Sequence, residues 1–187
     1  MAVKNIVIKR GNNIIASVPP TSMSLTEKVM GGGVITASFT YHQAFAFMIG
    51  DFIEISNVTF KLNVLPKVTK ESTNKYIYDC VFEDQFFDLG KTEFMVIGDV
   101  EFDLVGDLMT FVQLLVQNLN RTGSGWTVGS VQDSTAKNIH FSCENCLSVA
   151  QKLCSQENFD CEMYLVGKQI NFHSFGTVTG HVLKYGY

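Results

Sequence analysis

Four of the five cysteines lie in the last quarter of the 187-residue sequence, where they are the strongest candidates for a metal site. Cys143 and Cys146 have the spacing of a zinc knuckle. The remaining ligands would have to come from Cys154, Cys161, His140 and His173. This second group lacks a paired spacing, and Cys146 and Cys154 fall on the apolar side of a predicted helix, where a thiol packs as a small hydrophobe. We therefore predict buried, reduced thiols with no metal and no disulfide.

Acidic side chains alternate with apolar ones along two predicted strands. Asp99, Glu101 and Asp103 share one strand face. Three carboxylates in a row could hold calcium, form a solvated face or line a channel, and the residues leave these readings open. Asp79 and Glu83 occupy the polar face of a second strand, with few basic residues nearby to balance them.

The motifs expected of an enzyme are incomplete. The glycines Gly31–Gly33 precede neither Lys-Ser nor Lys-Thr, so they predict a turn between strands in place of a phosphate-binding loop. The serines in 123–125 and 129–130 lack the full Gly-x-Ser-x-Gly pattern of a nucleophile elbow. The histidines have no partner that the sequence identifies: His42, His140, His173 and His181. We expect neither catalysis nor a cofactor.

Composition limits the class of protein and its partners. Hydrophobic residues make up 46% and charged residues 17%, as in a globular chain with a substantial core. The 14 basic and 18 acidic residues give a net charge of −4, which argues against specific nucleic-acid binding. The longest apolar run, Ala44–Ile49, is far shorter than the roughly 20 residues that cross a bilayer. Ile6–Ile8 is too short for a signal-peptide core, so we expect a protein that stays inside the cell.

The first half of the chain carries the two-residue period of antiparallel strands. Three segments show it: Val34–Tyr41, the hairpin 52–64 with its turn at Ser56–Asn57, and Tyr76–Glu83. The polar stretch Lys70–Lys75 is predicted to be an exposed loop. Residues 1–90 therefore form a β-barrel-like domain of short antiparallel strands.

In the second half the period changes to that of helices. Apolar residues recur at helical spacing from Asp107 to Asn120, and again from Asn145 to Glu157 with Ser142 as the candidate N-cap. Three strand-like segments follow these helices: 126–128, 161–165 and 170–173. Residues 91–187 are predicted to be a small α+β domain with two helices, which makes the whole chain α+β.

The order of these features resembles a known family. The matching segments are Gly50–Ile53, Phe60–Leu62, Tyr76–Glu83 with Phe87–Leu89, Asn118–Arg121, Gly125–Gly129 and Leu183–Gly186. Together they resemble the N-terminal part of the hub proteins at the tail tip, or baseplate, of bacteriophages, in the versions carried by prophages. Members of that family continue past the Tyr-Gly motif into a further barrel domain, whereas this sequence ends at Tyr187. The resemblance therefore implies that the chain is truncated at its C-terminus.

The resemblance implies a structural protein of the virion tail, present in the bacterial cytoplasm before assembly. It implies a homotrimeric ring that continues the tail tube and docks other tail proteins, and a monomer stays open for the isolated fragment. The short apolar runs predict no membrane partner. In such a ring Asp79 and Glu83 would face the lumen, where negative charge keeps DNA from adhering. Two alternatives stay open: a cell-wall hydrolase component, and a carbohydrate-binding β module that would use Trp126 and the tyrosines for stacking.

Overall fold

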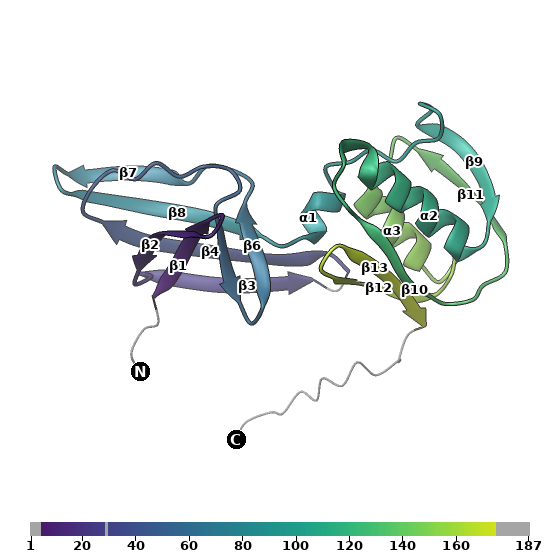
Figure 1. The fold of residues 1–187 in the computed structure, drawn as a ribbon, viewed down its shortest axis with the longest axis horizontal. Coiled ribbons are helices and arrows are strands. Elements are labelled where there is room, and N and C mark those ends of the chain that lie inside the picture. The colour runs from purple at the N-terminus through teal and green to yellow at the C-terminus, as the bar shows by residue number, and fades with distance from the viewer. Residues whose placement is uncertain (1–4, 29, 175–187) are drawn as a thin grey trace, which may run out of the picture. The chain divides into compact units, whose positions relative to one another are not determined.

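The chain folds into two compact units, Met1–Asp88 and Leu89–Tyr187. The computed structural model describes residues 5–28 and 30–174. The predicted α+β class is confirmed, because a curled antiparallel sheet forms the first unit and helices with short sheets form the second (Figure 1). His181 and the motif Leu183–Gly186 lie outside the described residues.

The first unit is one curled, antiparallel sheet of eight strands (Figure 1). The strands are β1 (Ile6–Arg10), β2 (Asn13–Val18), β3 (Ser22–Lys28), β4 (Gly32–Tyr41), β5 (Phe52–Ile55), β6 (Val58–Leu62), β7 (Lys67–Ser72) and β8 (Lys75–Glu83). Their order in the sheet is β2-β1-β5-β6-β8-β4-β3, and β7 pairs with the half of β8 that β6 leaves free. Within the described residues, β2, β3 and β7 each pair with one neighbour only.

The core of the first unit lies on the concave side of this sheet. Alternate side chains of the central strands are fully buried there, among them Ile35, Phe39, Tyr78 and Phe82. The segment between β4 and β5 covers these residues, with Phe47 at 5.2 Å from the Tyr78 ring centre. The backbone N–H of Phe45 donates to the Tyr78 hydroxyl over 2.6 Å, which satisfies that polar group inside the core.

A buried carboxylate joins β1 to the start of β5. Asp51 is 1% exposed and accepts two hydrogen bonds from the Arg10 guanidinium, at 2.7 and 2.9 Å, and one from the Met48 N–H at 2.8 Å. Burial by itself would raise the pKa of Asp51, but these hydrogen bonds and the charge of Arg10 outweigh it and lower the pKa. Asp51 is therefore charged at neutral pH.

The second unit places two helices against two small sheets (Figure 1). Its elements are β9 (Glu101–Gly106), α2 (Leu108–Leu119), the 3-10 turn η1 (Asn120–Thr122), β10 (Thr127–Val131), β11 (Lys137–Ser142), α3 (Cys146–Cys154), β12 (Cys161–Val166) and β13 (Gln169–Ser174). The short helix α1 (Phe86–Leu89) spans the boundary between the units. β10, β13 and β12 form one sheet and β11 and β9 form the other. No helix in the described ranges is long and apolar enough to span a bilayer.

Both long helices begin where a side chain can cap them. The Asp107 carboxylate accepts the Thr110 N–H at 2.8 Å, and the Asn145 side-chain oxygen accepts the Ser148 N–H at 2.9 Å. The predicted cap at Ser142 is wrong, because Ser142 ends β11. The apolar stripe of α2 is buried as its spacing predicts, and Leu115 is fully inaccessible.

The expected loop at Lys70–Lys75 is also wrong. This segment is the end of β7, a turn at Thr73–Asn74 and the start of β8. All six residues of β7 are exposed, so the strand has no buried face that would give it a hydrophobic alternation. Its sequence therefore has the composition of a loop although its backbone pairs with β8.

Candidate functional site

The polar outer face of the first sheet carries Asp79 and Glu83 on β8. Asp79 is exposed and accepts a hydrogen bond from the Ser38 hydroxyl at 2.6 Å, and Glu83 accepts one from the Asn63 side-chain amide at 2.5 Å. Lys67 lies opposite Asp79 in the ladder, and Lys61 lies opposite Glu83. Neighbouring strands thus place a lysine across from each acid in the ladder, and the Lys61 ammonium itself lies 3.3 Å from Asp88.

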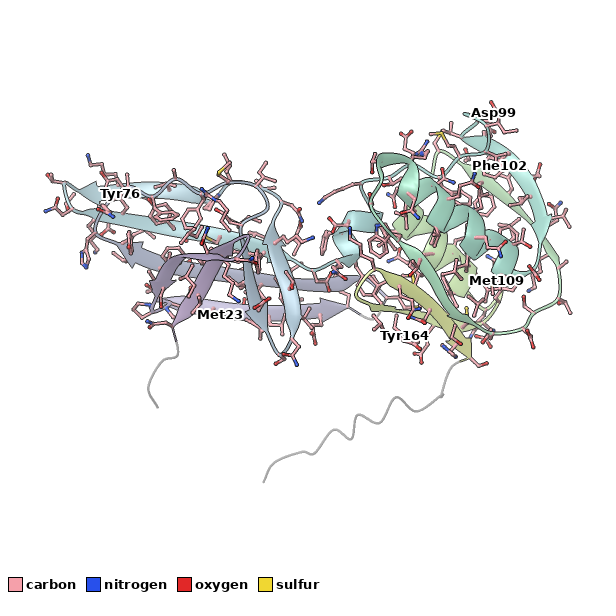
Figure 2. All side chains as sticks on the ribbon, viewed as in Figure 1. Met23, Tyr76, Asp99, Phe102, Met109 and Tyr164 are labelled. Carbon is pink, nitrogen blue, oxygen red and sulfur yellow. The ribbon has the colours of Figure 1, made fainter. Side chains whose placement is uncertain are left out.

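The acids near β9 do not form one continuous row. Asp99 belongs to a tight hairpin, in which its backbone and that of Val96 exchange hydrogen bonds of 3.0 and 2.9 Å. Glu101 and Asp103 lie on the exposed face of β9, and the Asp103 carboxylate is 3.3 Å from the His140 ring. Figure 2 labels Asp99 at this end of the second unit. In the described part of the chain no three His, Cys, Asp or Glu side chains are grouped closely enough to hold a metal ion.

The cysteines lie in different surroundings. The Sγ atoms of Cys154 and Cys161 are buried 3.8 Å apart. Cys146 is buried, and burial raises the pKa of its thiol to about 12, although Arg121 acts in the opposite direction. Cys143 is exposed, contrary to the prediction of buried thiols, so the two cysteines with knuckle spacing lie in opposite environments.

The two candidate histidine ligands are engaged elsewhere. His140 faces Asp103 on the outer side of β11, and the His173 ring stacks on Tyr164 with centres 5.4 Å apart. Neither is part of a group of metal ligands among the described residues.

The glycine run forms the turn that its sequence predicts. Gly32 has φ +82°, and a Cβ there would lie 2.6 Å from a carboxylate oxygen of Asp84, so both conformation and space call for glycine. The Asp84 carboxylate accepts the N–H groups of Gly33 at 2.6 Å and Phe86 at 2.9 Å. Burial is the largest influence on Asp84 and raises its pKa despite these two hydrogen bonds.

A strained apolar tip on the second unit was not predicted from the sequence. Ile97 has φ +52° and a relative exposure of 102%. A β-branched residue seldom adopts this left-handed conformation, and here its side chain gains no burial in return. Beside it lies a hollow of about 260 Å³, lined mainly by Met95, Leu114, Asn118 and Arg121. The dipeptide Ile97–Gly98 was the available signal, because a glycine next to a strand marks a tight hairpin.

Trp126, the candidate stacking residue of a carbohydrate site, is only 4% exposed. Its backbone N–H donates to the Asn120 side chain at 2.7 Å, and the same side chain donates to the Trp126 carbonyl at 2.7 Å. The indole therefore belongs to the core of the second unit and offers no flat exposed surface to a sugar.

Comparison with known proteins finds likeness in structure alone. No family model matches the sequence, and no curated protein matches it. The prophage tail protein gp18 of Listeria monocytogenes EGD-e superposes with a TM-score of 0.65 at 13% identity, over 98% of this chain and 56% of its own. The 43 kDa tail protein of prophage MuSo2 from Shewanella oneidensis gives a TM-score of 0.62 at 14% identity, over 90% of this chain and 54% of its own.

Both structural neighbours are thus tail proteins of prophages, and the chain spans little more than half the length of each. At these identities the likeness shows a shared fold. The fold extends over nearly the whole chain and so includes both units.

Proposed function

We propose that the chain is a structural component of a phage or prophage tail. The observation that carries this proposal is the fold, which superposes over 98% of its length on a prophage tail protein. A protein whose work is to form contacts needs surfaces in place of a catalytic centre. The incomplete enzyme motifs and the buried Trp126 favour this reading over a hydrolase or a carbohydrate-binding module.

The finer part of the proposal is a tail-tip, or baseplate, hub. Three copies would form a ring that continues the tail tube and docks other tail proteins, so that the protein resides in the virion tail after its synthesis in the bacterial cytoplasm. The curled sheet of the first unit supports this part, because its end strands β2 and β3 each have an edge that no other described strand pairs with. Open strand edges are backbone surfaces that another chain can extend.

The outer face of β4 and β8 is our candidate for the lumen wall. It carries Thr36, Ser38 and Asp79, with Lys67 opposite Asp79 and Lys61 opposite Glu83 in the ladder, so it is polar and of mixed charge. Such a wall lacks the excess of positive charge that would hold the phosphates of passing DNA.

The test is to locate the chain in virions of the phage that encodes it. Induced, purified particles should contain the chain, and an antibody against it should label the distal end of the tail. Particles without the chain would overturn the structural role. Label along the whole tube or at the head would overturn the hub and leave a structural role in place. Imaging of the tail tip should show Asp79 and Glu83 facing the channel, and an outward orientation would refute the lumen assignment.

A further inference from the structure

Two strands of this chain have unpaired edges and opposite charge. β7 pairs only with β8, and β9 pairs only with β11, among the described residues. β7 carries Lys67, Lys70 and Glu71, and Glu71 pairs with Lys75 at 2.5 Å, whereas β9 carries Glu101 and Asp103. These charged side chains are exposed, and each strand also exposes a valine: Val68 is 50% and Val105 66% exposed. Figure 2 labels Tyr76 on the β7–β8 hairpin and Phe102 on β9 (Figure 2).

The two edges are complementary in register. Both strands have six residues, so an antiparallel ladder can set Lys67 against Gly106 and continue without a gap. That register places Val68 opposite Val105 and Lys70 opposite Asp103. Residues directly opposite one another share a face of the sheet, so the apolar pair and the ion pair would lie side by side on one face.

We propose that β7 of one copy of this chain pairs with β9 of a second copy. The contact joins Lys67–Lys70 to Asp103–Gly106, and it joins the first unit of one copy to the second unit of the next. It ends at Lys70 because the register of β7 against β8 shifts between Lys70 and Ser72, which bends the edge there. The backbone hydrogen bonds supply affinity, and the charged pair selects the partner strand.

Charge and the valine pair together favour this contact over a symmetric one. Two β9 edges would set carboxylates near each other, so that like pairing is disfavoured. Two β7 edges can set Lys67 opposite Glu71, but that register places Val68 opposite Lys70. The mixed pairing joins valine to valine and lysine to aspartate. A mixed contact is head-to-tail, and such contacts close into rings when the rotation between copies allows.

This contact would supply a ring of the kind proposed above. It is argued from the two strand edges, so the pairing can be wrong while the assignment to a phage tail is right. The test is sedimentation velocity of the full chain over concentrations up to about 1 mM, the weak limit of specific association. We expect association that weakens as salt rises, because the pair lies at an exposed surface. A chain that stays monomeric throughout overturns the pairing.

Charge reversal identifies the surfaces. Lys70→Glu and Asp103→Lys should each weaken association about tenfold, because like charges then face each other across the ladder. The double variant K70E/D103K restores opposite charges at every contact and should recover most of the loss. Lys168→Glu and Glu157→Lys are the matched controls, since both side chains are exposed and lie outside the strand edges discussed above. Far-UV circular dichroism checks that each variant is folded, because Trp126 lies in the second unit and Lys70 in the first. The proposal is overturned if neither charge reversal weakens association, or if the double variant associates more weakly than either single variant.

Discussion

Replacing Ile97 by glycine should stabilise the second unit, although the change removes a large apolar side chain. Ile97 and Gly98 form the two central positions of the hairpin that precedes β9, with φ values of +52° and +90°. A two-residue hairpin turn of this kind requires positive φ at both positions, and Asn-Gly is its preferred sequence. Glycine at position 97 satisfies the backbone without strain.

The magnitude follows from what the side chain gains and costs. Since Ile97 is 102% exposed, its removal forfeits no buried area. Left-handed backbone costs an L-residue about 1–2 kcal/mol, which glycine avoids. Glycine in turn gives the unfolded chain more freedom, at a cost of about 0.5–1 kcal/mol. Taking the middle of each range, the balance is a gain of about 0.75 kcal/mol in the free energy of unfolding.

Urea unfolding followed by tryptophan fluorescence measures this gain. The chain has one tryptophan, Trp126, and it is buried in the second unit, so its emission reports that unit alone. With a slope of about 2 kcal/mol per molar urea, the midpoint should rise by about 0.25–0.5 M at unchanged slope.

Two further substitutions serve as controls for the backbone argument. Ile97→Asn should also raise the midpoint, because asparagine tolerates the left-handed region, whereas Ile97→Val keeps the β-branch and should leave it unchanged. A midpoint for Ile97→Gly at or below that of the parent chain would refute the strain reasoning.

Three other results are expected. Leu115→Ala should lower the free energy of unfolding by about 2–5 kcal/mol, because it truncates a fully buried side chain. Gln113→Ala on the exposed side of α2 should change it by less than about 0.5 kcal/mol. Equal effects would show that the wrong face of α2 has been assigned to the core. Arg10 keeps the pKa of Asp51 below its unfolded value, so the ion pair stabilises the fold at neutral pH, and this contribution is lost as pH falls through the lowered pKa. Asp51→Asn should therefore flatten the acid side of a curve of stability against pH. An unchanged acid side would count against the pair. A thiol reagent should label Cys143 in the folded chain well before the buried cysteines, and elemental analysis should find no zinc, with stoichiometric zinc as the contrary result.

The helices of the second unit were predictable because their signals are local. The apolar period from Asp107 to Asn120 lies within one short segment, and α2 occupies Leu108–Leu119. Strands with one buried face were predictable for the same reason, as in Tyr76–Glu83, which lies within β8.

Other features were harder to predict because they depend on how separate elements pair and pack, which the pattern within one element does not show. β7 has no buried side, so only its ladder to β8 shows that it is a strand. The acids Asp79 and Glu83 seemed unbalanced because their lysines come from other strands. The cysteine pair 154 and 161 meets only after α3 and β12 have packed.

The position of β8 has a consequence for how the protein is made. In the sheet β8 lies between β6 and β4, so the strands that precede it form two separate groups, β2-β1-β5-β6 and β4-β3. Nothing joins these groups into one ladder until the chain has been synthesised as far as Glu83. We expect the nascent first unit to remain open on the ribosome, with both groups exposing apolar faces, until β8 emerges and inserts between them. Its folding would then depend on the rate at which residues 75–83 are delivered.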